Sequence, residues 1–516
     1  MPDYKTYRLK ITVLTPLHIG NGREMLRGYD FAEKHGEIWR FNENALLEAQ
    51  NIDDPKIAEQ LARTKPADLI TDDREYKDGS ALFRYHIPGQ ALSQDGRVRE
   101  FIKNVYDQPY LPGSSLKGAL RTAIGWWEWK TKHLYPDLNK VSSPPRFEAD
   151  RRKFDKKKAA NRYEQDIFYP SAPSGKGPNY DLMRALQVSD SQPIDPKRMQ
   201  LINAAVYRNW SMERVDKISS LEVLPASLLL EGVALKIDTR LFGSTPQSEQ
   251  WKKLNFGDPK RLTEWVKICQ QYARQRIETE IEYYTNQAKN SPKISNAVSL
   301  YHRWQSLQAA ENESAFLLQL GWGTGWDGKT FDGQLREDDN FMLEIISGFR
   351  LGAHHSKDYQ SGDEFPMSRR LPYKDQRAPL GYPLGWVLVN VTEEGADFME
   401  TDWQKRILET VTTGEIPARV APSPKPAPKP QPKPLIAEFT DIPNIGDRFK
   451  GEVFNQEGKA LDLFIPGLED TVAYAHISAE NNDTSKRYAE GESVICEVIG
   501  KKQVGRVWQI ECRRVS

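Results

Sequence analysis

Residues 110–124 read YLPGSSLKGALRTAI, in which a proline, a glycine and two serines lead into a stretch with helical periodicity. Gly113 allows a tight backbone approach, and Ser114 or Ser115 is the expected N-cap. The apolar side chains follow the spacing of a buried helical stripe, at Leu116, Ala119, Leu120, Ala123, Ile124 and Trp127. The sequence therefore predicts an amphipathic helix that begins at the two serines.

Two cations, Lys117 and Arg121, lie one helical turn apart on a different face of this predicted helix. Backbone amides at a helix N-terminus, together with nearby cations, can hold an anion such as a phosphate. A capped helix that only packs into a core would look the same, and this segment alone favours that simpler interpretation. The stretch lacks the G-x-x-x-x-G-K-[ST] spacing of a Walker-type phosphate loop.

The bulk composition narrows the class of protein. A chain of 516 residues can form two or three domains, and its 38% hydrophobic content suits a globular protein. The formal net charge is zero, so any nucleic-acid binding must depend on local basic patches. Cys269, Cys496 and Cys512 have neither zinc spacing nor the pattern of a disulfide framework, which fits a reducing cytoplasm. We expect a cytoplasmic protein without a membrane partner, metal or cofactor; the pair His354–His355 is interpreted as part of a polar loop.

Five segments, in this order along the chain, resemble motifs of the RAMP superfamily of CRISPR proteins. Within that superfamily they are most similar to the family of the fifth Csm subunit of type III-A complexes. The segments are TPLHIGNG at 15–22, the PGSSLKG stretch, LQVSDSQPID at 186–195, GWGTGWDGKT at 321–330 and FPMSRRL at 365–371. The resemblance implies an α+β fold, with a ferredoxin-like or RRM-type body that carries helical insertions.

The resemblance also implies a function. Such a subunit is not an enzyme; it binds the CRISPR guide RNA (crRNA), caps the 3′-end side of the effector and supports crRNA maturation in antiviral defence. Its partners would be other Csm subunits, especially the backbone RAMP subunit, and a host exoribonuclease that trims the guide. The implied RNA-binding residues are His18, Gly20, Gly22, Gly113, Ser114, Ser115, Lys117, Arg121, Gly323, Gly325, Lys329, Arg369 and Arg370.

Other interpretations remain open from the sequence. His18 could be the acid/base of a metal-independent crRNA-processing endoribonuclease, although a histidine anchored at a strand end is the favoured interpretation. A free-standing adaptor for single-stranded RNA is a third possibility. Arg369 and Arg370 could bind phosphate or pair with carboxylates, and Trp322 could stack on a base or enter the core.

Further elements are predicted up to residue 420, where strands alternate with helices and long loops. Strands are expected at 7–13, within 222–240, at 316–320 and at 386–391, and helices at 51–72, 258–287 and 298–311. Residues 145–162 are strongly basic, which indicates a solvated loop or an arm on the RNA backbone. Core candidates in the 222–240 segment are Leu228, Leu230, Val233, Leu235 and Ile237.

The tail after residue 420 has two parts. Residues 421–434 read APSPKPAPKPQPKP, a composition typical of a semi-rigid polyproline II linker. Residues 435–516 resemble the OB-fold RNA-binding repeat, a small β-barrel, in GDRFKGEV at 446–453, AYAHIS at 473–478 and YAEGESVICEVI at 488–499. Acids outnumber bases in 441–516, so protein docking remains an alternative to RNA. The RNA-binding candidates are Phe454, Phe464, Tyr474, His476, Lys501 and Arg506.

Overall fold

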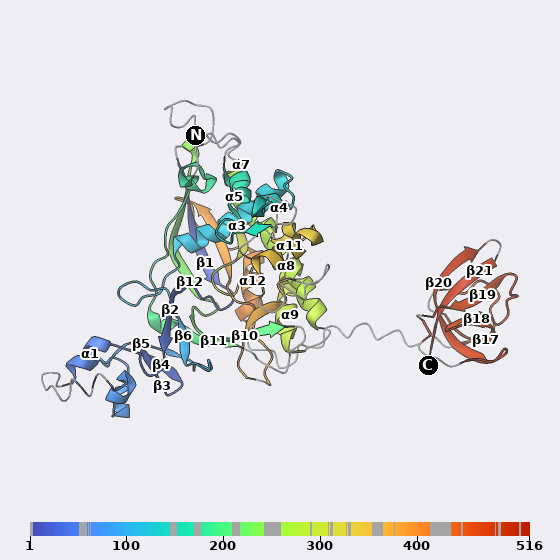
Figure 1. The fold of residues 1–516 in the computed structure, drawn as a ribbon, viewed down its shortest axis with the longest axis horizontal. Helices are drawn as coiled ribbons and strands as arrows, with labels where there is room; N and C mark the ends of the chain where they lie inside the picture. The colour runs from blue at the N-terminus through green and yellow to red at the C-terminus, as the bar shows by residue number, and fades with distance from the viewer. Residues whose placement is uncertain are drawn as a thin grey trace. The chain divides into compact units, whose positions relative to one another are not determined.

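The chain divides into two compact units, Met1–Glu415 and Ile416–Ser516, which a computed structural model defines separately (Figure 1). We call the first unit the body and the second the C-terminal unit. The predicted linker, 421–434, lies outside the described residues. The structure describes residues 4–50, 59, 61, 63–144, 152–169, 177–208, 217–241, 260–288, 292–307, 309, 313–326, 328, 332–352, 365–375, 377–412, 435–444, 447–479, 481–482, 487–504 and 507–515.

A five-stranded antiparallel sheet forms the centre of the body, in the order β13-β15-β1-β12-β9. Its strands are β1 (Tyr4–Val13), β9 (Leu186–Val188), β12 (Leu229–Asp238), β13 (Ala315–Gln319) and β15 (Trp386–Glu393). All five predicted core residues of the 222–240 segment are buried. The predicted strands at 7–13, 316–320 and 386–391 are confirmed, because alternating or continuous apolar side chains face a packed core there.

Helices pack on this sheet. In α3 (Gly113–Thr131) the predicted stripe is confirmed, with Leu116, Leu120, Ala123 and Ile124 fully buried. The single helix predicted at 258–287 is two helices, α7 (Lys260–Thr263) and α8 (Trp265–Ala288), and the next is α9 (Ser295–Ser306). Other helices among the described residues of the body are α4 (Leu138–Val141), α5 (Asn161–Phe168), α10 (Asp332–Leu335), α11 (Asp339–Phe349) and α12 (Asp402–Thr412). Among the described residues, no helix is long and apolar enough to cross a membrane.

A second five-stranded sheet has the order β14-β10-β11-β6-β2. Its strands are β2 (Gly20–Leu26), β6 (Arg97–Phe101), β10 (Gln200–Arg208), β11 (Ile218–Val223) and β14 (Ser368–Pro372). Only the β6–β11 pairing is parallel among the pairings described for this sheet. Strand β2 is an edge strand whose first five residues are exposed.

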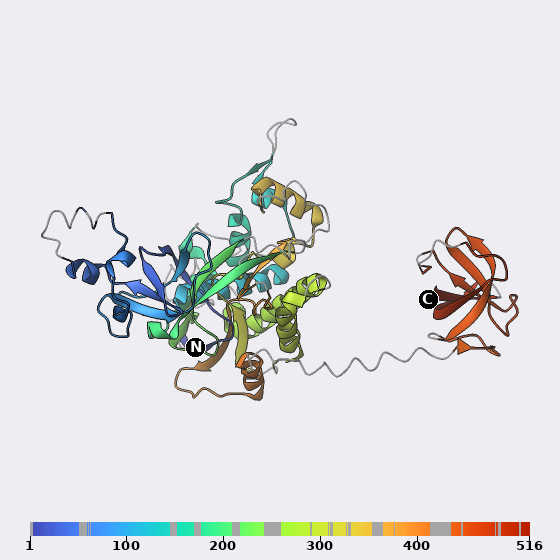
Figure 2. The ribbon, with the colours of Figure 1, turned by 90° about the horizontal axis from the view of Figure 1, so that it is seen from below.

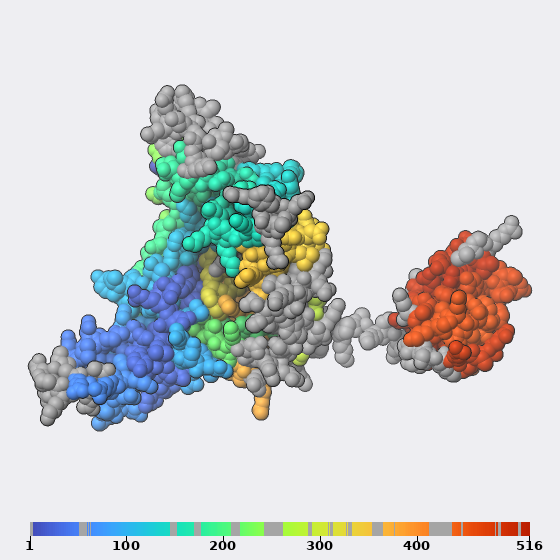
Figure 3. Space-filling view, viewed as in Figure 1, coloured from blue at the N-terminus to red at the C-terminus, as the bar shows by residue number. Residues whose placement is uncertain are grey.

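The described residues between 28 and 96 form a protruding part with its own small core. Strands β3 (Phe31–Lys34), β4 (Glu37–Phe41) and β5 (Phe83–Pro88) make a sheet beside α1 (Glu43–Glu48), at one extremity of the body (Figures 2 and 3). Of the helix predicted at 51–72, residues 51–58, 60 and 62 lie outside the described residues. The described end, 63–72, is not an α-helix but contains a 3₁₀ turn at Pro66–Leu69.

The described part of the basic segment 145–162 is structured. It contains β8 (Lys153–Phe154), which pairs with β7 (Ser142–Ser143), and it leads into α5. The Phe154 ring lies 5.0 Å from that of Phe349 in an edge-on contact. From Arg152 onward, this segment therefore packs on the body.

The C-terminal unit is a sheet in the order β16-β17-β18-β19-β21-β20, in which β17 also pairs with β20. The pairings of β17, β18, β19, β21 and β20 thus form a closed cycle. Two of the described pairings, β16–β17 and β19–β21, are parallel. The strands are β16 (Leu435–Ile436), β17 (Arg448–Glu457), β18 (Ala460–Phe464), β19 (Ala473–Ile477), β20 (Ser493–Val504) and β21 (Val507–Arg514). Alternate residues such as Val453, Leu463 and Ala475 fill its separate core.

Candidate functional site

Residues 321–326 and 328, called the glycine loop below, lie against the segment that follows β1. Gly321 has a φ of 72°, and a Cβ atom there would lie 2.2 Å from the backbone oxygen of His18. The backbone N–H of Trp322 donates to that same oxygen at 2.8 Å. Only glycine fits this position without strain, because the φ is left-handed and the approach is closer than a side chain permits. Two motifs far apart in sequence are therefore joined here.

His18 is buried beneath the glycine loop. Its Nδ1 lies 2.7 Å from the backbone oxygen of Glu222, and its ring makes edge-on contacts with Phe101 and Trp322. A Cβ atom on Gly20 would lie 2.9 Å from the histidine Nε2. Burial lowers the pKa of His18 to about 4, so the ring is neutral near pH 7. The geometry is that of a histidine anchored at a strand end.

The buried His18 makes folding stability depend on pH. Its pKa falls from 6.5 in the unfolded chain to about 4 in the folded one. Protons therefore bind preferentially to the unfolded state as the pH drops through this window, and stability present above pH 6.5 is lost toward pH 4. We expect a loss of about 3 kcal/mol from this group. Chemical denaturation at several pH values should show a weaker pH dependence for His18→Gln than for the unsubstituted chain, and equal dependences would contradict the assignment.

The N-terminus of α3 is capped by an aspartate from the VSDS motif. The helix begins at Gly113, after Pro112, which provides no side-chain cap. The Gly113 N–H donates to Asp190 Oδ1 at 2.7 Å, so the prediction that Ser114 or Ser115 caps the helix is wrong. A Cβ atom on Gly113 would lie 2.3 Å from the backbone oxygen of Val188, which shows how tightly the helix end abuts β9. This carboxylate already satisfies the positive end of the helix.

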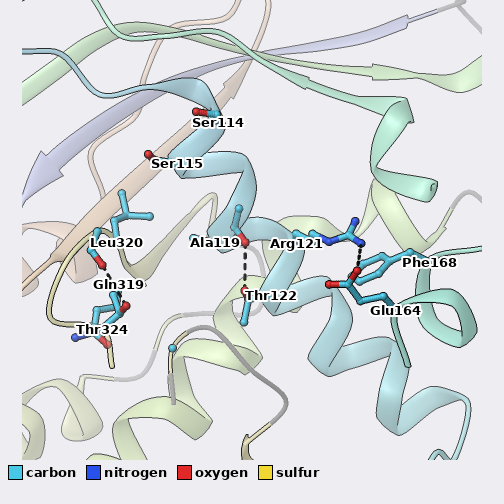
Figure 4. A pocket seen from close by; sticks show the side chains of 13 residues that line it. Ser114, Ser115, Ala119, Arg121, Thr122, Glu164, Phe168, Gln319, Leu320 and Thr324 are labelled. Carbon is cyan, nitrogen blue, oxygen red and sulfur yellow. Dashed lines mark hydrogen bonds and ion pairs between the residues drawn. The ribbon is translucent and has the colours of Figure 1, made fainter. Parts of the chain in front are cut away.

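A cavity of about 400 Å³ lies between α3 and the glycine loop (Figure 4). Ser114 and Ser115 line it from the first turn of the helix, and Thr324 and Gly328 line it from the loop. Figure 4 shows the two serine side chains on the helix and Thr324 on the opposite side. Hydroxyl groups can donate hydrogen bonds to phosphate oxygens, so the two serines are placed for anion contact although they do not cap the helix.

Arg121 is occupied by contacts within the protein. Its Nη1 lies 2.8 Å from an oxygen of Asp181, and its guanidinium group stacks 3.7 Å from the centre of the Phe168 ring. A second carboxylate, that of Glu164, lies 3.7 Å from Nη2. Lys117 is half-buried, and burial lowers its pKa. The two cations therefore do not form an open pair, although their role in RNA binding stays a prediction.

The structure separates the two arginines of FPMSRRL, which the sequence left open. Arg369 is 9% exposed; its Nε lies 3.1 Å from Glu280, and it stacks on Tyr283. Arg370, the next residue of β14, is exposed and lies with its guanidinium carbon 4.8 Å from the centre of the Trp322 ring. Adjacent strand residues point to opposite faces, which explains why one arginine is internal and the other is not.

Arg99 of β6 is a member of this site that sequence reasoning missed. Its guanidinium carbon lies 5.9 Å from the centre of the same Trp322 ring. The signal was present in RVREF at 97–101, where Arg97 and Arg99 flank the apolar Val98 and so fall on one face of the strand. Nothing in the sequence indicated that the face lies beside the glycine loop.

The other candidates in the body have simpler surroundings. Gly22 and Gly325 have positive φ values with open space around them, whereas Gly323 packs against Leu384. Lys329 lies outside the described residues, as do His354 and His355. Within the described ranges there is no group of three or more histidine, cysteine or acidic side chains that could hold a metal ion.

In the C-terminal unit, three of the predicted aromatic residues gather on one surface. The ring centres of Phe454 and Phe464 are 4.5 Å apart, and those of Phe454 and Tyr474 are 6.3 Å apart. His476 lies beside them, with its Nδ1 2.7 Å from Asp462. Lys501 instead reaches the backbone oxygen of Pro443, at 3.5 Å. Arg506 lies outside the described residues.

Two known proteins are similar to this chain in sequence. The chain is 28% identical over 219 residues to a Streptococcus thermophilus protein named CRISPR system Cms protein Csm5, covering 39% of this chain and 55% of that one. It is 24% identical over 308 residues to the Methanocaldococcus jannaschii protein of the same name, covering 58% of this chain and 66% of that one. The chain thus spans less than two-thirds of the length of either relative.

A solved structure shares the fold. One chain in a cryo-EM structure of a Csm-crRNA-target RNA ternary complex in a type III-A CRISPR-Cas system superposes with a TM-score of 0.51 at 22% identity. The match covers 74% of this chain and 100% of that one, and it shows a mixed α+β fold of the same kind. The family model of the RAMP superfamily matches residues 10–354, most of the body, so the chain belongs to the RAMP superfamily.

Proposed function

We propose that this chain is a Csm5-type subunit of a type III-A CRISPR effector, which binds crRNA without cleaving it and caps the 3′-end side of the complex. Its partners are then crRNA, the other Csm subunits with the backbone RAMP subunit foremost, and a host exoribonuclease that trims the guide. Similarity to the two Csm5 proteins supports this role. The proposal places the chain in the cytoplasm, where the guide is processed.

One observation carries the proposal: segments distant in sequence meet at the glycine loop. The loop holds the backbone of His18, shares a cavity with Ser114 and Ser115, and brings Trp322 under Arg370. Close backbone, hydroxyl groups and arginines are the groups that contact the sugar-phosphate backbone of RNA without reading its sequence. A subunit that must hold guides of any sequence needs such a surface.

We further propose finer fold assignments that suit this function. In the body, the strand order β15-β1-β12-β9, with α3 after β1 and α8 after β12, supports a ferredoxin-like arrangement. In the C-terminal unit, the closed cycle of pairings and the parallel β19–β21 pair support an OB-fold barrel. The boundaries at 1–420, 421–434 and 435–516 belong to the same proposal.

The geometry of His18 argues against the nuclease alternative. A general base must reach the ribose hydroxyl, yet this ring is buried and its Nδ1 is used by Glu222. The purified chain, incubated with repeat RNA in the absence of metal, is therefore expected to leave that RNA intact. Cleavage that disappears in His18→Gln would place the protein among the nucleases.

The assembly role is tested by purifying the effector with and without this chain and sequencing the 3′ ends of the bound guide. We expect the chain to co-purify with the other Csm subunits and with crRNA, and its omission to change the guide-length distribution. Identical distributions, or a chain that binds RNA but never joins the complex, would favour the free-standing adaptor instead.

Deleting residues 421–516 should preserve assembly but alter the length or protection of the guide 3′ end. The two units have separate hydrophobic cores, so removal of the C-terminal unit leaves the core of the body complete. The measurement is guide-length profiling of complexes that carry the full or the shortened chain. Loss of assembly would show that the C-terminal unit holds the complex together. Unchanged 3′ ends would show that the unit does not act on the guide and would favour a protein as its ligand.

A further inference from the structure

Two arginines and a tryptophan from three separate segments form one cluster on the second sheet of the body. Arg99 comes from β6, Trp322 from the glycine loop and Arg370 from β14. We propose that this cluster, called the Trp322 clamp below, is a subsite for one phosphodiester group of a single-stranded RNA, with Arg370 as its main ligand. The inference rests on the proposed function, because it names a contact point for the same RNA.

The indole fixes both guanidinium groups in place. Their central carbons lie 4.8 Å (Arg370) and 5.9 Å (Arg99) from the centre of the Trp322 ring, within the range of a cation–π contact. Trp322 is itself held, since its backbone N–H donates to the backbone oxygen of His18 and its side chain packs on the small core around Leu221. The clamp is therefore ordered before any ligand arrives, which reduces the entropy lost on binding.

The charges around the clamp are unbalanced. Glu24 is shared between two guanidinium groups, at 3.2 Å from Arg97 and 3.1 Å from Arg99. In the described ranges, no carboxylate lies within ion-pair distance of Arg370. Partial desolvation of the Arg370 guanidinium group, although the residue as a whole is exposed, and the neighbouring charge of Arg99 both lower its pKa; the group nevertheless stays protonated. An anion placed beside Arg370 would relieve this repulsion.

The anion that suits this position is a phosphate. A guanidinium group presents a planar fork of donors that matches two phosphate oxygens, and the bond is charge-assisted. The clamp lies beside the exposed start of β2, where a side chain at Gly22 would meet nothing within 4 Å, so a strand of RNA has room to pass. Nothing in this arrangement reads a base edge, as suits a guide of variable sequence.

The test measures binding of a fluorescently labelled oligouridylate to the full chain over a series of salt concentrations. Arg370→Ala should weaken binding and reduce the slope of log affinity against log salt by about 0.7, the value for one phosphate contact with a single strand. Arg370→Lys keeps the charge and should keep most of the slope. The control is Arg97→Ala, which removes the same charge from β6 of the same sheet, beside Arg99 and the shared Glu24, but does not touch Trp322.

The outcomes separate the subsite from the wider function. A slope that changes equally in Arg370→Ala and Arg97→Ala, with both variants folded by circular dichroism, would overturn the clamp while leaving RNA binding in place. No binding by the unsubstituted chain would contradict the proposed function itself. Inorganic phosphate at matched ionic strength should not displace the oligonucleotide; displacement that requires Arg370 would identify a small anion, rather than RNA, as the ligand.

Discussion

Glu222→Ala is expected to lower the free energy of unfolding of the body by about 3–5 kcal/mol. The Glu222 side chain is 0% exposed, and it accepts hydrogen bonds from Tyr85 Oη at 2.7 Å and from the Phe101 N–H at 2.8 Å. It also pairs with Lys103 Nζ at 2.5 Å, and that lysine side chain is only 4% exposed. Removing the carboxylate leaves a buried ammonium group without its closest anion. Urea denaturation followed by tryptophan fluorescence measures the loss.

A double variant distinguishes the buried charge from a simple loss of volume. Glu222→Leu with Lys103→Met removes both charges and keeps apolar bulk, so it should recover much of the stability that Glu222→Ala loses. If Glu222→Ala lowers stability by less than about 1 kcal/mol, the typical net value of one hydrogen bond, the network does not stabilise the body as described.

Gly113→Ala is the second substitution with a large expected effect. The added Cβ would meet the backbone oxygens of Val188 and Ser189 at 2.3 and 2.6 Å, and backbone cannot rotate away as a side chain can. We expect the helix end to shift, at a cost of about 1–3 kcal/mol, and the Asp190 cap to weaken with it. Thermal and chemical denaturation of the body report this loss.

Gly118→Ala is the matched control, because it makes the same change in the same helix where nothing lies within 4 Å of the new atom. It should leave the body unchanged or stabilise it by up to about 1 kcal/mol, since alanine favours the helical backbone. Equal effects of the two substitutions would show that α3 does not abut β9 as tightly as described.

The sequence predicted those features that a local pattern determines. The alternation in β12 identified its buried residues, and the stripe in α3 identified the helix face that packs inward. The capping of α3 could not be predicted in the same way, because Asp190 is 77 residues from Gly113. The sequence offered Ser114 and Ser115 as caps. The structure instead uses the Asp190 carboxylate, which comes from another element and is a stronger acceptor at a helix N-terminus.

In the candidate site, too, a local sequence pattern predicted some features and tertiary contacts decided the others. Alternation along β14 requires that Arg369 and Arg370 face opposite ways, but only the packing of α8 decides which one meets Glu280. Likewise, Asp181 lies 60 residues from Arg121, so the pairing of that cation depended on the tertiary fold. Whether the remaining residues bind RNA stays a prediction, which the salt-dependence and guide-length experiments address.

The position of β1 has a consequence for the growing chain. This first strand pairs on one side with β12 and on the other with β15, so Thr12 lies opposite both Leu229 and Leu388. Synthesis proceeds at about 5–20 residues per second. The apolar side chains of β1 therefore stay unpacked until β12 and β15 have left the ribosome. A fold with such high contact order closes slowly, and the nascent body exposes unpaired strand edges until its last strand emerges. We therefore expect a chaperone requirement during synthesis that the smaller, locally paired C-terminal unit does not share.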